Sequence, residues 1–407
     1  MSCRHCGHEL EHAFVDLGFA PPSNAYLTAE DLARPEQYYP LRTRVCGSCW
    51  LVQTEDYADA GELFNAEYAY FSSTSTSWLQ HATQYSERMI REFGLNSSSL
   101  VVEVASNDGY LLKNFVAAKV PCLGIEPTAS TAAAAEALGI SVIREFFGEA
   151  LGRRLANKGK QADLIVGNNV FAHVPDINDF TRGLKAALKP EGIITLEFPH
   201  LMRLIEFRQF DTIYHEHFSY LSLFAAKAIF NAAGLRIWHV EELPTHGGSI
   251  RIFGCHHAAV RIDTAAVGKM LREEESRGMR EISTYTGFQG HTERIKNDLV
   301  AFLIEQKRTG KRVVAYGAAA KGNTLLNFGG VKPNLLPFVC DAAAAKQGKY
   351  MPGSHIPILP PSALPKLRPD FVLILPWNLA EEVRNQLAKV VAQGTRFVTA
   401  VPRLEIA

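Results

Sequence analysis

Four side chains that can ionise or exchange protons stand in a row at Tyr214-His215-Glu216-His217, inside a run from Asp211 to Tyr220. Such groups are costly to bury, and a loop does not need four of them in succession to be soluble. Histidine and glutamate can accept protons near neutral pH, and tyrosine can donate one. The stretch therefore predicts a proton-transfer site if ligand-binding segments flank it, and a solvated loop with one or two capping residues is the competing interpretation.

The chain before this stretch alternates between strand and helix patterns. Alternation of this kind predicts a parallel sheet flanked by helices, and ligands bind such sheets beyond the carboxyl ends of the strands. The expected strands cover 100–105, 122–126, 141–144, 163–167 and 193–198, followed by a helix that begins near His217 and runs to about Ala233, and by an antiparallel pair at 235–243 and 249–254. Before them, a Ser/Thr-rich turn after Tyr68 and Tyr70 predicts a capped helix that runs to about Phe93.

The first two strand ends predict a cofactor that contains adenosine. Glu126 ends the second strand about 20 residues after the loop Ser106–Gly109, a spacing from which a carboxylate contacts ribose hydroxyls. The loop lacks the Gly-x-Gly-x-x-Gly pattern that close approach to a pyrophosphate requires, which disfavours a dinucleotide and an oxidoreductase. S-adenosylmethionine fits better, and an acidic strand end that binds nothing is the alternative. Asn168, Asn169 and His173 follow the fourth strand and lie at the same edge.

Two Cys-x-x-Cys pairs near the start of the chain predict a metal site. Cys3 and Cys6 precede Cys46 and Cys49, and Cys46 stands 40 positions after Cys6. Two such Cys-x-x-Cys pairs supply four thiolates, which complete a tetrahedral zinc site with no open position. The zinc should therefore be structural, with a redox dithiol as the weaker alternative. Prolines in the long insert suggest irregular chain between the pairs.

Composition excludes several classes of protein. The 407 residues carry 42 basic and 42 acidic side chains, so no basic field favours nucleic acid or an anionic membrane. No apolar run reaches the ~20 residues of a membrane span, and no secretory signal is visible. We expect a cytoplasmic protein, monomeric or a small homo-oligomer, with two or three domains.

A second α/β pattern follows a charged helical segment at 264–308. Strands are expected at 311–316, 336–341, 371–375 and 396–401. Small residues between the first strand and its helix, beside Lys321, suit a phosphate, although the turn is not a Walker A loop. Asp341, Lys346 and His355 lie near the next strand end. A structural β–α turn is the competing interpretation.

Together these motifs resemble the sugar C-3′-methyltransferases of deoxysugar biosynthesis. The resemblance rests on Leu100–Leu112, Gly124–Pro127, Asn169–Asp176, Thr245–Arg251 and Tyr316–Asn323, with the four cysteines and Tyr-His-Glu-His, in the family's order. It implies a class I S-adenosylmethionine methyltransferase core, an α/β fold, with a small zinc module and a C-terminal Rossmann-like α/β domain. The expected divisions are 1–57, 58–257 and 258–407.

The same resemblance implies a reaction and its catalytic residues. Methylation of C3 next to a 4-keto group requires a base, a donor to the enolate oxygen and in-line alignment of the carbon with the methyl group. His217 is implied as the general base, Glu216 as its support and Tyr214 as proton donor or shuttle. His173, Tyr68 and Tyr70 are implied in the sugar pocket or as enolate stabilisers. The residues alone leave open whether His215, Glu216 or His217 takes the proton.

Ligand-binding residues are implied in two groups. S-adenosylmethionine should contact Glu103, Ala105, Ser106, Asn107, Asp108, Gly109, Tyr110, Leu111, Glu126, Pro127, Glu145, Phe146, Phe147, Asn168, Asn169 and Val170. A nucleotide-linked keto-deoxysugar should contact His246, Gly247, Ser249, Arg251, Tyr316, Gly317, Ala318, Ala319, Lys321, Asn323, Asp341, Lys346 and His355. An O- or N-methyltransferase, which needs no base for a ketone, and a non-catalytic nucleotide-sugar-binding protein are the competing hypotheses.

Overall fold

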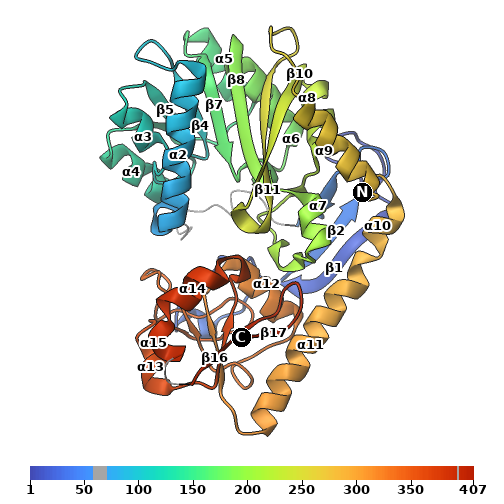
Figure 1. Ribbon diagram of the computed structural model, residues 1–407, viewed down its shortest axis with the longest axis vertical. Coiled ribbons are helices and arrows are strands. Elements are labelled where there is room, and N and C mark those ends of the chain that lie inside the picture. Colours follow the sequence, from blue (N-terminus) through green and yellow to red (C-terminus); the bar gives the residue numbers. More distant parts are fainter. Residues whose placement is uncertain (58–70, 392–393) are drawn as a thin grey trace.

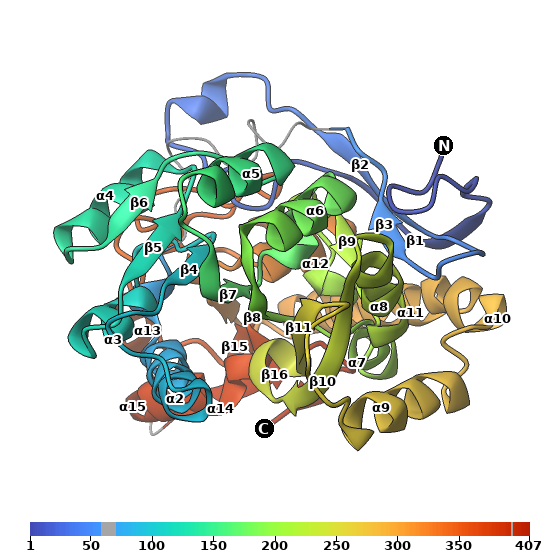
Figure 2. The same cartoon turned by 90° about the horizontal axis from the view of Figure 1, so that it is seen from above.

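Three β-sheets organise the chain in the computed structural model, which describes residues 1–57, 71–391 and 394–407 (Figure 1). The central sheet has the order β10-β11-β8-β7-β4-β5-β6, which Figure 2 shows from above. Its parallel strands are β4 (Val101–Val104), β5 (Cys122–Ile125), β6 (Ser141–Ile143), β7 (Ala162–Asn168) and β8 (Leu188–Pro199). The strands β10 (Leu235–Leu243) and β11 (Ser249–His256) are antiparallel, as predicted.

Helices cover both faces of this sheet because its strands are apolar on both sides. One face packs against α5 (Glu149–Asn157), α6 (Ile177–Ala187) and α8 (Leu223–Ala232). The other packs against α2 (Thr76–Phe93), α3 (Leu112–Ala117) and α4 (Ala129–Ala137). The Ser75 hydroxyl caps α2 by accepting from the Trp78 amide, and Gly94 ends that helix in the left-handed conformation, so the predicted helix is confirmed.

A smaller sheet joins the N-terminal segment to the stretch around His217. Its order is β1 (His12–Ala20), β2 (Tyr39–Val45), β3 (Val52–Thr54) and β9 (Ser219–Tyr220). Prolines of the insert lie in irregular chain between β1 and β2, as predicted, but these two strands themselves were not predicted. One prediction is wrong, since the helix expected to begin near His217 begins only at Leu223. The physical reason is long-range pairing, since β9 aligns antiparallel to β3 from far along the chain.

The C-terminal sheet has the order β14-β13-β12-β15-β16-β17. The four predicted strands correspond to β12 (Val313–Tyr316), β13 (Val339–Cys340), β15 (Phe371–Ile374) and β16 (Arg396–Thr399). The sequence missed the short β14 (Ile358–Leu359) and β17 (Glu405–Ile406). The helix α12 (Ala320–Phe328) follows β12, and α13 (Ala363–Leu367), α14 (Ala380–Gln386) and α15 (Ala388–Val391) complete this region.

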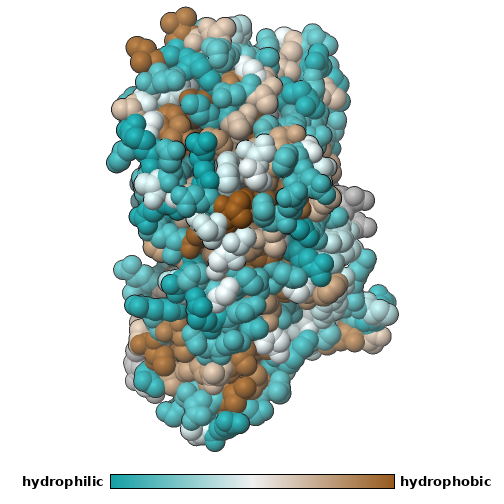
Figure 3. Space-filling view, turned by 90° about the vertical axis from the view of Figure 1, so that its right-hand side faces the viewer, coloured by the Kyte–Doolittle hydropathy of each residue, from teal (hydrophilic) through white to brown (hydrophobic). Residues whose placement is uncertain are grey.

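A helical arm connects the central and C-terminal sheets. It consists of α9 (Ala265–Ser276), α10 (Ile282–Thr286) and the long α11 (Phe288–Arg308), which runs down one side of the molecule in Figure 1. Its inner face packs on β1, where the rings of Phe14 and Phe288 stack with centroids 4.6 Å apart. The side of the molecule shown in Figure 3 is mostly hydrophilic, with smaller apolar patches. Among the described helices, none is both long and apolar enough to span a bilayer.

A buried carboxylate fastens this arm to the central sheet. Glu274 of α9 accepts hydrogen bonds from the Leu223 and Phe224 amides, which begin α8, and its Oε1 lies 2.7 Å from His200 Nε2. These amides belong to the first turn of α8 and have no acceptor within their own helix. Glu274 therefore completes the capping of α8, whose N-cap Ser222 accepts from the Ala225 amide, and it also links the arm to the end of β8.

Glu274→Gln should lower the stability of the protein. The amide keeps the shape of the carboxylate but loses the charge and one acceptor, so buried donors remain unpaired at a cost of about 1–3 kcal/mol. Scanning calorimetry should show a lower unfolding temperature. Glu275→Gln is the matched control, because Glu275 is solvent-exposed and pairs only with the exposed Arg280. Equal effects of both substitutions would contradict a capping role for Glu274.

Candidate active site and metal centre

The loop after β4 is held in an unusual backbone conformation. Ala105, Asn107 and Gly109 all have positive φ angles, at 58°, 48° and 77°. At Gly109 a side chain is excluded, since a Cβ atom would lie 2.5 Å from Ile140 Cδ1. Glu126 fixes the turn, because its Oε2 accepts from the Asn107 amide at 2.9 Å and its Oε1 from the Thr128 amide at 3.0 Å. Strained backbone of this kind is typical of ligand sites.

Three carboxyl groups gather beside this loop. Glu103, Asp108 and Glu126 are all buried. Burial, and then the charges on Asp108 and Glu126, raise the pKa of Glu103 well above its usual value. Within the described residues no hydrogen-bond donor reaches Asp108 Oδ1, Ser106 Oγ or the Oδ1 atoms of Asn168 and Asn169. Acceptors without donors fit a ligand that brings ammonium, hydroxyl and amino groups of its own.

The other residues predicted at this edge have varied surroundings. Leu111 and Val170 are buried in the core, and Pro127 follows Glu126 at the end of β5. Phe147 packs edge-on against Phe180, whereas Phe146 is 53% exposed. Glu145 pairs with Arg154 on the surface. These residues, Pro127, Glu145, Phe146 and Phe147, line the rim after β5 and β6.

His217 is buried and its ring orientation is fixed. Its Nδ1 lies 3.0 Å from the Thr212 carbonyl oxygen, and because a carbonyl only accepts, Nδ1 carries the proton of the neutral ring. Nε2 is then left with a lone pair. Burial, and then the positive charge that His173 could carry, hold the pKa of His217 well below its usual value. The ring centroids of Tyr214 and His173 lie 4.0 Å and 4.5 Å from the ring centroid of His217.

The two neighbours of His217 in the Tyr-His-Glu-His stretch point elsewhere. Glu216 accepts a hydrogen bond from Asn24 Nδ2 at 3.1 Å, and burial raises its pKa. His215 Nε2 lies 3.3 Å from the Pro40 carbonyl, and the His215 ring meets Tyr39 edge-on. Thus the support of His217 comes from the Thr212 backbone, while Glu216 and His215 face the N-terminal segment. Tyr68 and Tyr70 lie outside the described residues.

The backbone around His217 is bound by all three parts of the molecule. Thr54 of β3 donates to the His217 carbonyl at 3.1 Å, and Thr324 of α12 donates to the Ile213 carbonyl at 2.9 Å. The Phe218 amide donates to the Ala172 carbonyl at 2.8 Å. The candidate base is therefore fixed by the N-terminal sheet, the central domain and the C-terminal domain together.

Several residues predicted for the sugar nucleotide meet where β12 ends. The Ala318 carbonyl accepts from the Tyr26 hydroxyl and from Lys346 Nζ, and the Ala318 amide donates to Asp341. Asn323 donates to the Ser23 carbonyl. Gly317 has a φ angle of 91°, and a Cβ atom there would collide with Pro376. The residues around this turn, Tyr316, Gly317, Ala318 and Ala319, are thus packed between the N-terminal insert and the C-terminal sheet.

Lys321 stands at the start of α12, and its charge acts on His217 of the Tyr-His-Glu-His stretch. Its Nζ lies 2.6 Å from Asn378 Oδ1 and 4.6 Å from the centroid of the Trp377 ring. Burial lowers the pKa of Lys321, and the charge on Asp211 opposes that effect. His355 is placed apart from this group, since its Nε2 pairs with Glu36 of the N-terminal insert at 2.8 Å.

The turn between β10 and β11 brings His246 to the edge of the central sheet. His246 has a positive φ of 54°, its Nε2 lies 2.6 Å from Asn169 Nδ2, and burial lowers its pKa to about 4. At Gly247 a Cβ atom would meet the Trp377 ring. Ser249 binds the Thr245 carbonyl, whereas Arg251 is buried in an ion pair with Glu197. Of the predicted substrate residues on this hairpin, His246, Ser249 and Arg251 therefore all have partners within the protein.

Sequence reasoning missed a buried polar cluster beside this turn. Glu197 of β8 contacts Arg251 Nη2 at 2.5 Å, His81 Nε2 at 2.8 Å and the Thr245 hydroxyl at 2.8 Å. Burial opposes ionisation of Glu197, but the hydrogen bond from His81 and the charge of Arg251 hold its pKa at about 2. The signal was a single glutamate inside the apolar strand Ile193–Phe198.

The four cysteines form the predicted metal centre. The Sγ atoms of Cys3, Cys6, Cys46 and Cys49 lie within 4.8 Å of one another, with the closest pairs 3.5 Å apart. Four thiolates about 2.3 Å from a common centre give such spacings, so the set fits tetrahedral zinc. Gln53 of β3 donates to Cys3 Sγ at 3.2 Å. The metal site is therefore connected to the strand whose Thr54 binds the His217 carbonyl.

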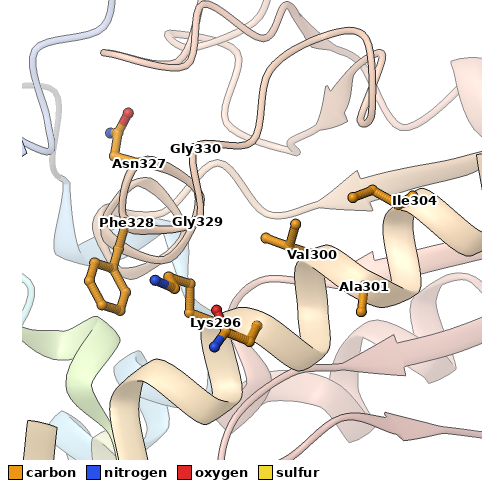
Figure 4. A pocket seen from close by; sticks show the side chains of 9 residues that line it. Lys296, Val300, Ala301, Ile304, Asn327, Phe328, Gly329 and Gly330 are labelled. Atoms are coloured by element: carbon orange, nitrogen blue, oxygen red, sulfur yellow. The ribbon is translucent and has the colours of Figure 1, made fainter. Parts of the chain in front are cut away.

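A pocket of about 540 Å³ opens elsewhere, between α11 and α12 (Figure 4). Val300, Ala301 and Ile304 form one wall, and Phe328 with Lys296 closes an end. None of the predicted cofactor, substrate or catalytic residues lines this pocket. The chemistry-bearing side chains converge instead at the carboxyl ends of β4, β5 and β7 and on the stretch after Asp211.

The sheet order and the cysteine cluster define a class I S-adenosylmethionine-dependent methyltransferase domain with a zinc-binding segment and a second α/β domain. Three family models match the chain. Residues 3–64 match "Putative zinc binding domain", residues 78–240 match "Methyltransferase domain", and residues 244–402 match "C-methyltransferase C-terminal domain". The predicted fold class is thereby confirmed.

The chain is also 36% identical to the C-methyltransferase NovU of Streptomyces niveus, over 98% of this chain and 95% of that protein. It therefore belongs to the C-methyltransferase family of NovU. Membership in this family confirms the predicted recognition and, with the cysteine cluster, the predicted cofactors S-adenosylmethionine and zinc.

Parts of the chain are also similar to solved structures. Magnesium protoporphyrin IX methyltransferase of Synechocystis PCC 6803, with bound S-adenosylmethionine, is 13% identical over 44% of this chain and 79% of its own, with a TM-score of 0.34. The YcgJ protein of Bacillus subtilis is 13% identical over 44% of this chain and 100% of its own, also with a TM-score of 0.34.

Removal of the zinc should reduce turnover without abolishing cofactor binding. Cys46→Ser breaks the metal site, and without zinc the N-terminal sheet loses the anchor that lets Thr54 hold the His217 loop. We expect methyl transfer to fall about tenfold or more because the candidate base His217 is misplaced, while S-adenosylmethionine affinity by calorimetry stays nearly constant.

Cys122→Ser is the control for this experiment, because Cys122 begins β5 and lies outside the cysteine cluster. It should retain zinc and full turnover. A Cys46→Ser protein that lacks zinc but keeps wild-type turnover would show that the N-terminal sheet does not support the base.

Proposed function

We propose that this chain transfers a methyl group from S-adenosylmethionine to C3 of a nucleotide-linked 4-keto-6-deoxy sugar through an enolate. The observation that carries the proposal is the buried His217, whose Nδ1 faces the Thr212 carbonyl and whose Nε2 lone pair is thereby available as a base. Membership in a family of C-methyltransferases supports carbon as the acceptor atom.

A base is needed because carbon next to a ketone is not itself a nucleophile. His217 Nε2 removes the C3 proton, the electron pair of that C–H bond forms a C3–C4 double bond, and the π pair of the C4 carbonyl moves onto its oxygen to give the enolate. S-adenosylmethionine supplies an electrophilic methyl group on a positively charged sulfur. The C4 carbonyl re-forms as the C3–C4 π pair makes the bond to the methyl carbon, and the electrons of the methyl–sulfur bond leave with the sulfur, giving S-adenosylhomocysteine. The proton on His217 is released to solvent. The neutral histidine required at the start is favoured by its burial.

The groups around His217 suit the remaining requirements. Tyr214 and His173, whose ring centroids lie within 4.5 Å of the His217 ring centroid, can donate to the developing oxyanion or relay the proton taken by His217 to solvent. His173 is neutral at pH 7, because burial lowers its pKa to about 4. Glu216 acts through the N-terminal insert by its contact with Asn24, and Tyr68 with Tyr70 would complete the sugar pocket.

The residues proposed to hold the two ligands belong to two different sheet regions, the central one and the C-terminal one. In the central region, Glu126 at the end of β5 takes the ribose hydroxyls, and the loop Ala105–Leu111 with Asp108 takes the ammonium end of the methionine. Asn168 and Asn169 contact the sulfonium, while the aromatic rim around Phe146 takes adenine. In the C-terminal region, Lys321 and the turn Tyr316–Ala319 take the phosphates of the sugar nucleotide.

Proton removal can be tested without methyl transfer. The enzyme is incubated with a nucleotide-linked 4-keto-6-deoxy sugar and S-adenosylhomocysteine in deuterated water, and C3 is followed by NMR. Wild-type enzyme should exchange the C3 proton, and His217→Asn should lower both exchange and methyl transfer by about a hundredfold or more. S-adenosylmethionine binding should survive the substitution.

His215→Asn is the matched control, because His215 belongs to the same stretch but faces Pro40 and Tyr39. It should keep the exchange rate near that of the wild type. Methyl transfer to an acceptor without any C3 exchange would favour an O- or N-methyltransferase, and the absence of both would sink the enzymatic proposal for this sugar class.

The pH profile of turnover should reflect the environment of the base. Protonation of His217 removes the lone pair, so kcat is lost as the pH falls through the pKa of that histidine. Since this pKa lies well below the usual value of 6.5, kcat should be flat from about pH 8 to 6.5 and decline only below that range. A decline already centred at or above pH 6.5 would rule out this environment for the base.

A further inference from the structure

Glu197 of β8 contacts two elements that carry residues of the proposed ligand sites. It has no exposed surface, and its backbone and side chain hold different elements. Its carbonyl accepts from the Asn169 amide at 2.7 Å, which fixes the residue that follows β7. Its Oε1 accepts from the Thr245 hydroxyl at 2.8 Å, which fixes the start of the turn between β10 and β11.

The residues that Glu197 holds meet one another directly. Asn169 Nδ2 lies 2.6 Å from His246 Nε2, and both residues have positive φ angles, at 55° and 54°. Two residues in a sparsely populated conformation persist only where their surroundings fix them. Glu197 supplies that restraint on both sides, through Asn169 on one and Thr245 on the other.

A second set of contacts closes the cluster from the side of α2. His81 Nε2 lies 2.8 Å from Glu197 Oε2, and the His81 ring stacks on Trp78 with centroids 5.0 Å apart. Trp78 in turn packs against the His246 ring at 5.1 Å. Arg251 balances the charge of the buried carboxylate at 2.5 Å. The position of His246 is therefore determined by polar contacts and by ring packing that both lead back to Glu197.

We propose that Glu197 is a positioning residue that fixes the Asn169–His246 pair between the methyl donor and the His217 loop, and thereby controls methyl transfer but not proton removal. This inference rests on the proposed function. Asn169 stands at the edge of the sheet where the cofactor is proposed to bind. A positive charge on His246 would lower the pKa of His217, so the two histidines lie within electrostatic reach of each other. None of the described contacts of Glu197 reaches the His217 loop itself. A small displacement of the pair would disturb alignment of the methyl group with C3 and leave the base in place.

The sharpest test substitutes Thr245, because removing one partner of the buried Glu197–Arg251 pair could prevent folding. Thr245→Val keeps the shape of the side chain and removes only the hydroxyl that binds Glu197. Methyl transfer at saturating substrates should fall about tenfold, while C3 deuterium exchange with S-adenosylhomocysteine bound stays within about twofold of wild type. Thr245→Ser restores the hydroxyl and should restore transfer. Glu197→Gln, where it folds, should show the same separation of the two rates.

Thr264→Val is the control. The Thr264 hydroxyl lies 2.8 Å from His239 Nδ1 on the outer strand β10, and it has no hydrogen bond to Glu197, Asn169 or His246, which the structure also describes. The substitution should leave both rates unchanged. Equal loss of exchange and transfer in Thr245→Val, or loss of neither, would overturn the proposal. Wild-type transfer without C3 exchange would sink the proposed function alone. In that case the positioning role of Glu197 is tested by kcat alone. The kcat of Thr245→Val must fall while its KM stays unchanged, and Thr245→Ser must recover the wild-type kcat.

Discussion

The backbone of residues 213–218 is the point on which the three parts of the molecule depend. Thr54 from the N-terminal sheet and Thr324 from α12 bind its carbonyl groups, and Ala172 binds its Phe218 amide. A buried backbone segment without regular secondary structure needs partners of this kind, since its polar groups are shielded from water. Because each partner comes from a different domain, the ring of His217 has a defined direction only when all three domains are folded and docked.

The central fold was predictable because its signals are local. Apolar runs ended by turns predicted β4 to β8, and the antiparallel pair β10 and β11 was predicted after a helix that follows these strands. The N-terminal strands were missed because β1 and β2 are joined across a long insert, and β9 is a strand only through its pairing with β3. Tertiary pairing of this kind leaves almost no trace in the residues themselves.

The candidate site was predictable in its residue types but not in its connections. The Tyr-His-Glu-His stretch indicated proton transfer, yet no spacing shows that Glu216 turns toward Asn24 or that a backbone carbonyl orients His217. Glu197 was visible as a charge in an apolar strand, but its partners His81 and Arg251 lie far away in sequence. Long-range polar contacts follow from the docking of elements, which local patterns do not encode.

The insert between the cysteine pairs loses less conformational entropy on docking because the metal closes it into a loop. Zinc joins Cys6 to Cys46, so the residues between them become a closed loop whose ends are fixed before they dock. This loop carries Ser23 and Tyr26 onto the C-terminal domain and Asn24 onto Glu216. Its docking therefore costs less conformational freedom than the docking of an open segment. By linkage, a ligand that draws the C-terminal domain toward this loop must also tighten the protein's hold on its metal.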